Sequence, residues 1–464
     1  MAQPLKKKWQ YIIREENFLS LAGNLVIASF GIAGFALMAR SLEANDFGQW
    51  VIFIAAGSFI EMFRFGITNT GLVRFLSGAT AENRQSLIGA NASIGIISTL
   101  LISITVFSCN LFFNDAVSHS GYRLFFRWYP LLALFNLPWN NALLILQADR
   151  RFGKMLLLKS INSVSFFLVL LVHLFFLPMT IEQLVIVYLV VNALTSTVSL
   201  ITGWDGMQLI RKATAESKRT LLQFGKYTTF TLVGTNLLRS ADTFILSLSP
   251  MGNAAVALYS IPLKLTELQQ IPLRSFTATA FPKMSKASLQ GNNEAVKNFF
   301  YTYAGAITYL FIGVSLFTFC FADLFVWILS GKQYLSADPV TGISAVNIVR
   351  IFSIYGLLLP IDRMTGIGLD SINQPRVNAV KVLLMLVANI AGDLIAIYVF
   401  ESLALVAVGS ILFTLVGIYV GFRFLDQQIG LRFRDIFSHG WDFYKQLYHR
   451  FISKQTAVVV KTGS

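Results

Sequence analysis

This chain has basic residues inside long apolar segments, where a positive charge is unusual. Each lies within or at the edge of a long apolar run: Arg64, Arg239, Lys264, Arg274, Arg350 and Arg363. A cation in hydrocarbon costs about 2.5–3.5 kcal/mol on insertion scales, so such residues usually face a bundle interior or a water-filled cavity. Because few acids accompany them, the pattern predicts a basic chamber for an anionic cargo.

Three of these cations have an acid at the i, i+3 spacing, which places both members on one helix face. The three pairs are Glu61/Arg64, Arg239/Asp242 and Lys264/Glu267. Each pair could simply lock a helix position, or its acid could compete with an anionic ligand for the cation. Asp362 adjoins Arg363 but points about 100° away from it. Arg350 lies near the end of its apolar run, where its side chain could extend to the interface.

Other polar groups in the apolar runs suggest hydrogen bonding or ion coupling. Asp393 is a lone acid that could bond a neighbouring helix or bind a proton or cation. Amide side chains that could contact sugars are Asn24, Asn69, Asn140, Asn141, Asn236, Gln269 and Gln270. The four histidines lack a paired metal-ligand spacing, and no Walker motif is present. We therefore expect no cofactor and no metal, with H+ or Na+ coupling as the open alternative.

The composition requires a membrane environment for these residues. Of the 464 residues 55% are hydrophobic and 13% are charged, and the mean hydropathy is +0.64. A membrane-spanning helix needs about 20 apolar residues, which predicts an all-α integral membrane protein with about twelve spans. The predicted spans are 19–40, 47–67, 87–113, 124–147, 155–177, 181–203, 227–248, 254–280, 299–322, 344–369, 376–399 and 402–425.

The distribution of charge predicts the orientation. Lys and Arg total 37 against 23 acids, and the basic residues concentrate in alternate loops, among them Arg376 and Lys381. The positive-inside rule then places both termini in the cytoplasm and requires an even number of spans. Cys109 and Cys320 lie in apolar runs and are interpreted as small hydrophobic residues buried in the membrane.

The chain divides into five predicted parts. They are a cytoplasmic N-terminus (1–18), a six-helix bundle (19–203), a basic cytoplasmic linker (204–226), a second six-helix bundle (227–426) and a basic, aromatic cytoplasmic tail (427–464). The tail mixes aromatic and basic residues, as does an amphipathic helix lying on the inner membrane surface. Residues 46–50 align with 255–259 and residues 70–74 with 279–283, which indicates a weak internal repeat. Two similar bundles in the same orientation are typical of transporters with parallel repeats.

Three motifs follow one another along the chain: ARSLEANDFGQW at 39–50, RSADTFIL at 239–246 followed by VALYS at 256–260, and IPL at 271–273 running to AFPKMS at 280–285. In this order and spacing they resemble the motifs of the Wzx-type polysaccharide flippases of the multidrug/oligosaccharidyl-lipid/polysaccharide (MOP) exporter superfamily. The resemblance covers about residues 19–426. One departure is FRFGI at 63–67, where relatives commonly carry an acid and this chain carries Arg64.

The resemblance implies a MATE/MOP-like secondary transporter and not an enzyme. Its expected cargo is a polyprenyl-pyrophosphate-linked oligosaccharide, which alternating access would carry from the inner to the outer leaflet of the bacterial cytoplasmic (inner) membrane. The assembled product would be a cell-surface polysaccharide such as the O-antigen of lipopolysaccharide or an exopolysaccharide. Expected partners are the lipid-linked oligosaccharide and a polysaccharide polymerase or other assembly proteins, and we expect a monomer.

Candidate roles follow for the residues singled out above. The expected substrate-binding residues are Arg64, Arg239, Lys264, Arg274, Arg363, Asn24 and Asn236. The expected charge partners or coupling residues are Glu61, Asp242, Glu267, Asp362 and Asp393. Guanidinium groups suit this cargo because they bind phosphate oxygens bidentately.

Two alternative functions fit the sequence less well. A cation-coupled drug exporter of the same superfamily would typically rely on acids in its first span, and residues 19–40 contain none. A membrane enzyme of glycan assembly, such as a polymerase or ligase, usually needs a substantial external loop, and the external loops predicted here are short.

Overall fold

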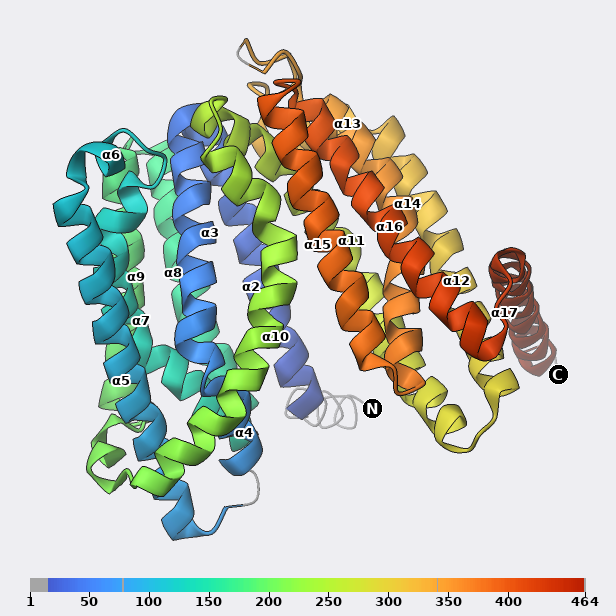
Figure 1. Ribbon diagram of the computed structural model, residues 1–464, viewed down its shortest axis with the longest axis horizontal. Coiled ribbons are helices and arrows are strands. Elements are labelled where there is room, and N and C mark those ends of the chain that lie inside the picture. The colour runs from blue at the N-terminus through green and yellow to red at the C-terminus, as the bar shows by residue number, and fades with distance from the viewer. Residues whose placement is uncertain (1–15, 77–78, 340, 463–464) are drawn as a thin grey trace. The chain divides into compact units, whose positions relative to one another are not determined.

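The computed structural model describes the backbone of residues 16–76, 79–339 and 341–462. Within these ranges it leaves the side chains of 16–25, 70, 227–228, 230–232, 235, 238–239 and 450–462 outside the description. The described chain is helical and contains no strand (Figure 1). The predicted all-α fold class is therefore confirmed.

The helices of the N-terminal part run from α2 to α10. They are α2 (Glu16–Ser41), α3 (Ala44–Gly66), α4 (Asn69–Leu76), α5 (Ala81–Phe112), α6 (Asn114–Ser118), α7 (Arg123–Ala148), α8 (Phe152–Phe175), α9 (Ile181–Ile201), the 3-10 helix η1 (Met207–Lys212) and α10 (Ala215–Ser247). The remaining helices are α11 (Gly252–Leu289), α12 (Asn293–Cys320), α13 (Ala322–Ser330), α14 (Ala345–Ser371), α15 (Pro375–Tyr398), α16 (Leu403–Ile429) and α17 (Phe433–Thr462).

Every predicted span coincides with one of these helices. Among the described residues nine stretches are long and apolar enough to cross a membrane. Three predicted spans are not among the nine. The described apolar part of α2 is only Val26–Ser41, and α10 and α11 are long helices of low mean hydropathy. These last two helices contain four of the seven predicted substrate-binding residues, namely Asn236, Arg239, Lys264 and Arg274.

The chain packs into two compact units. Unit 1 comprises 1–257 with 329–331, and unit 2 comprises 258–328 with 332–464. The linker and α10 pack within unit 1, where α10 contacts α3, α4 and α5. A Cβ added to Gly225 of α10 would lie 1.7 Å from the carbonyl oxygen of Ile67, so the two backbones touch. The predicted boundaries of the two six-span bundles stay a prediction.

Within unit 1 the connections gather at two opposite ends, as the alternating loops predict. At one end the Asn253 amide donates to Asn45 Oδ1 at 3.0 Å, which joins the start of α3 to the start of α11. At the other end Arg84, at the start of α5, pairs with Asp149 at the end of α7, with 2.6 Å between nitrogen and oxygen. Which end faces the cytoplasm remains the prediction made from the charges.

Local signals explain several helix boundaries. Thr180 and Gln183 form a reciprocal capping box at the start of α9. Pro375 occupies the first turn of α15, where its missing N–H costs nothing. Gly430 ends α16 in the left-handed conformation, with φ of 67°, which glycine adopts without steric cost. The chain then turns at once into α17.

Candidate functional site

The Arg64 side chain of α3 lies in the interior of unit 1, with only 1% of the residue exposed. Its Nη2 lies 2.8 Å from Oε2 of Glu61, one turn earlier on the same helix. Its Nη1 donates to the carbonyl oxygen of Ala133 in α7 at 2.6 Å, and Nη2 also donates to Asn136 Oδ1. The predicted Glu61/Arg64 pair is therefore present. The guanidinium of Arg64 forms its hydrogen bonds with groups of the protein itself.

Two aromatic side chains complete the surroundings of this pair. Tyr129 donates its hydroxyl to Glu61 Oε1 at 2.8 Å, and the guanidinium of Arg64 lies 4.2 Å from the ring centre of Phe65. A cation over an aromatic face is attracted by the ring quadrupole. The cluster joins α3 to α7, and its contacts are those of a group that holds two helices together. Any contact of Arg64 with a substrate stays a prediction.

The same part of α7 contains an irregularity at Pro138. Proline has no N–H, so the carbonyl of Leu134 loses its normal helical donor. One residue further on, Trp139 donates its backbone N–H to Ser196 Oγ at 3.2 Å, and this hydroxyl donates in turn to the carbonyl of Phe135. The Ser196 hydroxyl from α9 is thus inserted into the hydrogen-bond ladder of α7, a recognised cause of helix bending.

A buried ion pair that was not predicted lies in unit 2. Lys381 of α15 is 3% exposed, and its Nζ lies 2.7 Å from Asp362 Oδ1 of α14. The same ammonium donates to the Asp362 carbonyl at 2.7 Å and to Thr365 Oγ1 at 3.0 Å. The assignment of Lys381 to a basic loop was wrong, because Lys381 lies within α15, which begins at Pro375, and its ammonium contacts α14. Asp362 is accordingly a charge partner, but of Lys381.

Lys264 and Glu267 of α11 form the second i, i+3 pair that the sequence predicts. Lys264 Nζ lies 2.9 Å from Glu267 Oε2, and 25% and 43% of the two side chains are exposed. The third pair lies partly outside the described residues, because the Arg239 side chain is not described. The Asn24 side chain is also outside the description. In α10 Asp242 is buried and Asn236 is half-buried, and each has contacts of its own.

Arg274 of α11 and Arg363 of α14 differ from the cations described so far. Both residues are exposed, and neither forms an ion pair with any residue that the structure describes. By contrast Arg350, nearer the start of α14, pairs with Asp323 at 2.9 Å. In unit 2 Arg274 and Arg363 therefore lie six residues inside the ends of their predicted spans, and no described acid neutralises their guanidinium groups. Arg376 and Arg423 are also exposed and without a described acid, but they lie at the ends of their predicted spans.

The packing of α11 on α14 places these two arginines at a similar height. The rings of Tyr259 and Phe352 lie 5.5 Å apart, and a Cβ on Gly356 would lie 3.0 Å from Gln269 Oε1. The two helices therefore run in the same direction. From the second contact Arg274 lies about 7.5 Å and Arg363 about 10 Å further along, at 1.5 Å per residue. From the first contact the same rise gives about 22.5 Å for Arg274 and about 16.5 Å for Arg363, so the two arginines lie within roughly one helical turn of each other in height.

Asp393 of α15 is the deepest acid in unit 2. Asp393 and Asn389 are both 0% exposed, and the Asn389 amide donates to Asp393 Oδ2 at 3.2 Å. A Cβ on Gly409 of α16 would lie 3.6 Å from Asp393 Oδ1, so the neighbouring helix closes the site. Among the described residues no group of three or more His, Cys, Asp or Glu side chains could hold a metal ion.

The helix arrangement defines the class of protein. It resembles an inward-facing multidrug resistance MATE family transporter of the MOP superfamily, with 17% identity, a TM-score of 0.72, and coverage of 87% of this chain and 94% of that one. The lipid II flippase MurJ in an inward closed conformation gives 12% identity, a TM-score of 0.71, and coverage of 94% and 92%. A MOP superfamily transporter from Pyrococcus furiosus is 16% identical, with a TM-score of 0.61 and coverage of 90% of this chain and 95% of that one.

The chain is therefore a multi-pass membrane protein with the fold of MOP superfamily transporters. It belongs to the family of polysaccharide biosynthesis proteins, whose model matches residues 37–339. No curated protein matches the sequence significantly. The resemblance seen in the sequence motifs is thereby confirmed at the level of the family, and the fold is the one that MOP superfamily transporters have.

Proposed function

We propose that this protein is a flippase that carries a polyprenyl-pyrophosphate-linked oligosaccharide from the inner to the outer leaflet of a bacterial inner membrane. Membership of the polysaccharide biosynthesis family and the MOP superfamily fold support a transporter or flippase. The lipid II flippase MurJ, which has the same fold, handles a lipid-linked substrate according to its name. Alternating access would deliver the glycan for cell-surface polysaccharide assembly.

The observation that carries this proposal is the pair of exposed, uncompensated arginines Arg274 and Arg363. A guanidinium group offers a rigid fork of N–H donors that matches phosphate oxygens. Two such groups at similar heights on α11 and α14 suit a diphosphate, which presents oxygens on both phosphorus atoms. A cationic drug would be repelled by the same two groups.

Lys264 supplies a third cation on α11, and its pairing suggests how the cargo could leave. Its ammonium now lies 2.9 Å from Glu267, and both side chains are partly exposed. A phosphate that approaches can replace the carboxylate as the partner of Lys264. When the cargo departs, Glu267 takes the ammonium back, so release does not leave a bare cation.

A transport assay in proteoliposomes tests the role of the arginines. The purified protein is reconstituted with a fluorescent polyprenyl-pyrophosphate oligosaccharide, and a lectin added outside reports the glycan that reaches the outer leaflet. Hydrogen bonds to charged groups contribute about 1.5–3 kcal/mol, so Arg274→Gln and Arg363→Gln should each slow transport about 10- to 100-fold. Arg350→Gln is the matched control, because it removes a paired arginine from α14.

Wild-type rates in both variants would overturn the proposed site. Transport of a cationic dye in place of the lipid-linked glycan would favour the drug-exporter alternative. Neither result depends on which sugar the natural cargo carries, because the lectin is chosen for the glycan supplied.

For the driving force we propose Asp393 as the residue that binds the coupling H+ or Na+. A buried carboxylate in an apolar helix is costly unless it is protonated or binds a cation, and Asn389 supplies a neutral neighbour. Asp393→Asn keeps the shape and removes the charge. Transport should then lose its dependence on the H+ or Na+ gradient, whereas unchanged gradient dependence would exclude this residue.

A further inference from the structure

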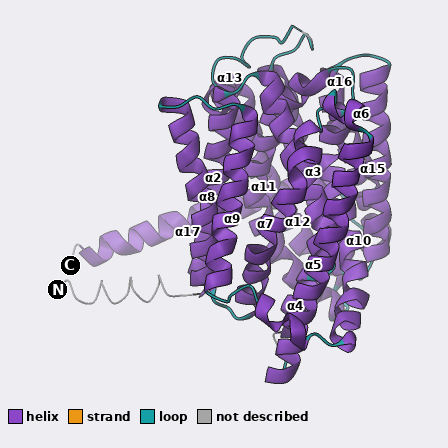
Figure 2. Cartoon of the chain, turned by 90° about the vertical axis from the view of Figure 1, so that its left-hand side faces the viewer, coloured by secondary structure: helices purple, strands orange, loops and turns teal. Residues whose placement is uncertain are grey.

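The C-terminal helix α17 contacts α12 of the same unit, and Figure 2 shows α17 projecting at a steep angle to the upright helices. At the crossing point Gly305 meets Gly440. A Cβ on Gly305 would lie 2.2 Å from the carbonyl oxygen of Ile436, and a Cβ on Gly440 would lie 2.6 Å from the carbonyl carbon of Gly305. The two backbones are therefore in direct contact, and only glycine allows this approach.

Hydrogen bonds fix α17 on both sides of this crossing. The backbone N–H of Arg432 donates to the Tyr301 hydroxyl at 2.6 Å, just before α17 begins. The Tyr444 hydroxyl donates to the carbonyl of Ala306 at 2.9 Å, one turn beyond the crossing. Burial raises the pKa of Tyr444, so its phenol stays protonated and able to donate. The position of α17 is thus set by named contacts.

The side chains of α17 separate cleanly into two faces at 100° per residue. The apolar arc contains Phe433, Ile436, Phe437, Gly440, Trp441, Phe443, Tyr444, Leu447 and Tyr448. The polar arc contains Arg434, Asp435, Ser438, His439, Asp442, Lys445, Gln446 and His449. Ile436, Gly440, Trp441 and Tyr444 of the apolar arc contact α12, where the ring centres of Trp441 and Tyr309 lie 6.2 Å apart. Phe433 contacts Phe422 of α16. Leu447 and Tyr448 of the same face remain exposed.

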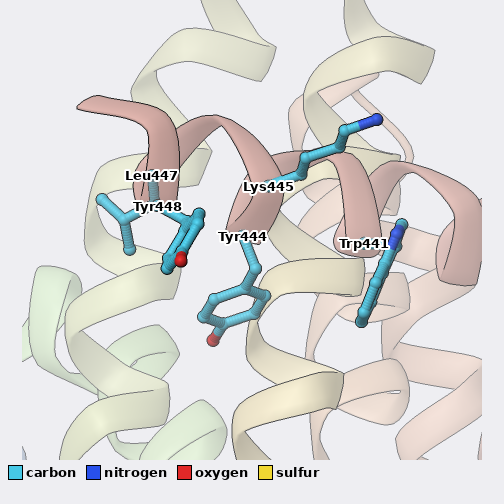
Figure 3. A pocket seen from close by; sticks show the side chains of 5 residues that line it. All are labelled: Trp441, Tyr444, Lys445, Leu447 and Tyr448. Atoms are coloured by element: carbon cyan, nitrogen blue, oxygen red, sulfur yellow. The ribbon is translucent and has the colours of Figure 1, made fainter. Parts of the chain in front are cut away.

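An apolar groove lies along α17 between Trp441 and Tyr448. It has a volume of about 590 Å³ and is lined by Trp441, Tyr444, Lys445, Leu447 and Tyr448. Figure 3 shows Trp441, Tyr444 and Tyr448 pointing to one side of the helix, while the Lys445 ammonium points to the other. Trp441 and Tyr448 are 62% and 65% exposed. The stem of Lys445 therefore lines an apolar groove while its charge remains outside it.

The height of the crossing matches a membrane interface. Gly305 lies six residues inside the predicted span 299–322, which is about 9 Å at 1.5 Å per residue. Amphipathic helices on membranes bury their apolar face about 5–10 Å into the boundary between headgroups and acyl chains. Residues 427–464 contain six Lys or Arg against two Asp, a charge that favours an anionic leaflet.

We propose that α17 lies in the plane of the membrane surface and that its groove beside α12 binds an anionic phospholipid. An acyl chain occupies the space under Trp441, Tyr444, Leu447 and Tyr448, and the Lys445 ammonium pairs with the phosphate. The Gly305–Gly440 contact fixes the depth of the helix. This binding site is separate from the arginines of α11 and α14 and does not depend on the nature of the cargo.

Spin labels test the orientation of α17 in full-length protein reconstituted into vesicles of phosphatidylglycerol and phosphatidylcholine. Both native cysteines are replaced by serine, and single cysteines are introduced as Trp441→Cys and Tyr448→Cys on the apolar face. Ser438→Cys and Asp442→Cys are the matched controls on the polar face. Relaxation by oxygen should exceed relaxation by a water-soluble nickel reagent at 441 and 448, with the reverse at 438 and 442. Equal water accessibility on both faces would overturn the in-plane helix.

Native mass spectrometry tests the lipid. Protein released from nanodiscs with equal amounts of the two phospholipids should retain phosphatidylglycerol preferentially. Removing one membrane-surface cation with Lys445→Gln should reduce this preference about fivefold, whereas Lys332→Gln, an exposed lysine outside the groove, should leave it unchanged. Gly440→Leu should displace α17 from α12 and abolish retention. Undiminished retention in that variant, or retention of only a polyprenyl phosphate when it is added, would refute the assignment.

Discussion

The Glu61/Arg64 cluster of unit 1 offers the sharpest test of how this protein tolerates a buried cation. Arg64 is 1% exposed, and the Glu61 side chain is 20% exposed. Glu61→Gln removes the only described acid that neutralises Arg64 and leaves a charge inside the bundle. Removing one partner of a buried ion pair costs about 3–5 kcal/mol. The partial exposure of Glu61 places the expected loss near the lower end, at about 3 kcal/mol.

A double-mutant cycle distinguishes this reasoning from a simple count of lost contacts. Arg64→Met removes the charge and retains much of the side-chain volume. In the double variant the glutamine introduced by Glu61→Gln can still accept the Tyr129 hydroxyl and can donate to Asn136, whose oxygen now accepts from Arg64. Replacing a buried pair with neutral groups is often close to neutral in stability. The double variant should therefore be more stable than Glu61→Gln alone.

Reversible unfolding in mixed micelles, titrated with SDS and followed by circular dichroism, measures the four free energies. A loss of about 3 kcal/mol corresponds to more than a hundredfold change in the unfolding equilibrium. Additive single effects would refute the argument that the two charges stabilise each other. If Arg64→Met left stability unchanged and abolished transport, Arg64 would be a cargo-binding residue and not a lock.

Three further predictions concern packing within single units. Asp362→Asn should destabilise the protein by about 3 kcal/mol, because Lys381 is left without its acid, and Asp362→Asn with Lys381→Met should recover most of this in the same SDS titration. Ser196→Ala should cost about 1–3 kcal/mol, because the Trp139 N–H and the Phe135 carbonyl lose their bridge. A thermal shift in detergent as small as that of an exposed Ser→Ala control would contradict this. Gly225→Ala should prevent normal packing of α10, since its Cβ would lie 1.7 Å from the Ile67 carbonyl oxygen, and limited proteolysis between α9 and α10 should become faster.

The fold could be predicted because its signal is local. Runs of apolar residues of bilayer length give the spans directly, and each predicted span coincides with a helix. The weakest cases were α10 and α11, which contain Arg239, Asp242, Lys264, Glu267 and Arg274. The polar residues that lower the hydropathy of these helices are among those that the sequence predicts to bind the cargo or to pair with its binding residues.

The candidate site could be predicted only where its contacts lie on one helix. The spacing of Glu61/Arg64 and Lys264/Glu267 identifies both pairs without knowledge of tertiary structure. The Lys381 pair joins α14 to α15, and no spacing rule connects it to Asp362. A signal was nevertheless present, because Lys381 lies five residues inside a predicted span and not in the adjoining loop.

The cations in the predicted spans thus fall into two groups, according to whether an acid neutralises them. Their positions within the predicted spans do not make this distinction. Arg64 and Lys381 are buried, and each has an acid within 2.8 Å. Such pairs stabilise the bundle only as long as both members remain. Arg274 and Arg363 are exposed and have no described acid. An exposed charge without an acid keeps its capacity to bind an anion. Substitutions in the first group should therefore reduce stability before transport, and substitutions in the second should reduce transport while stability is preserved.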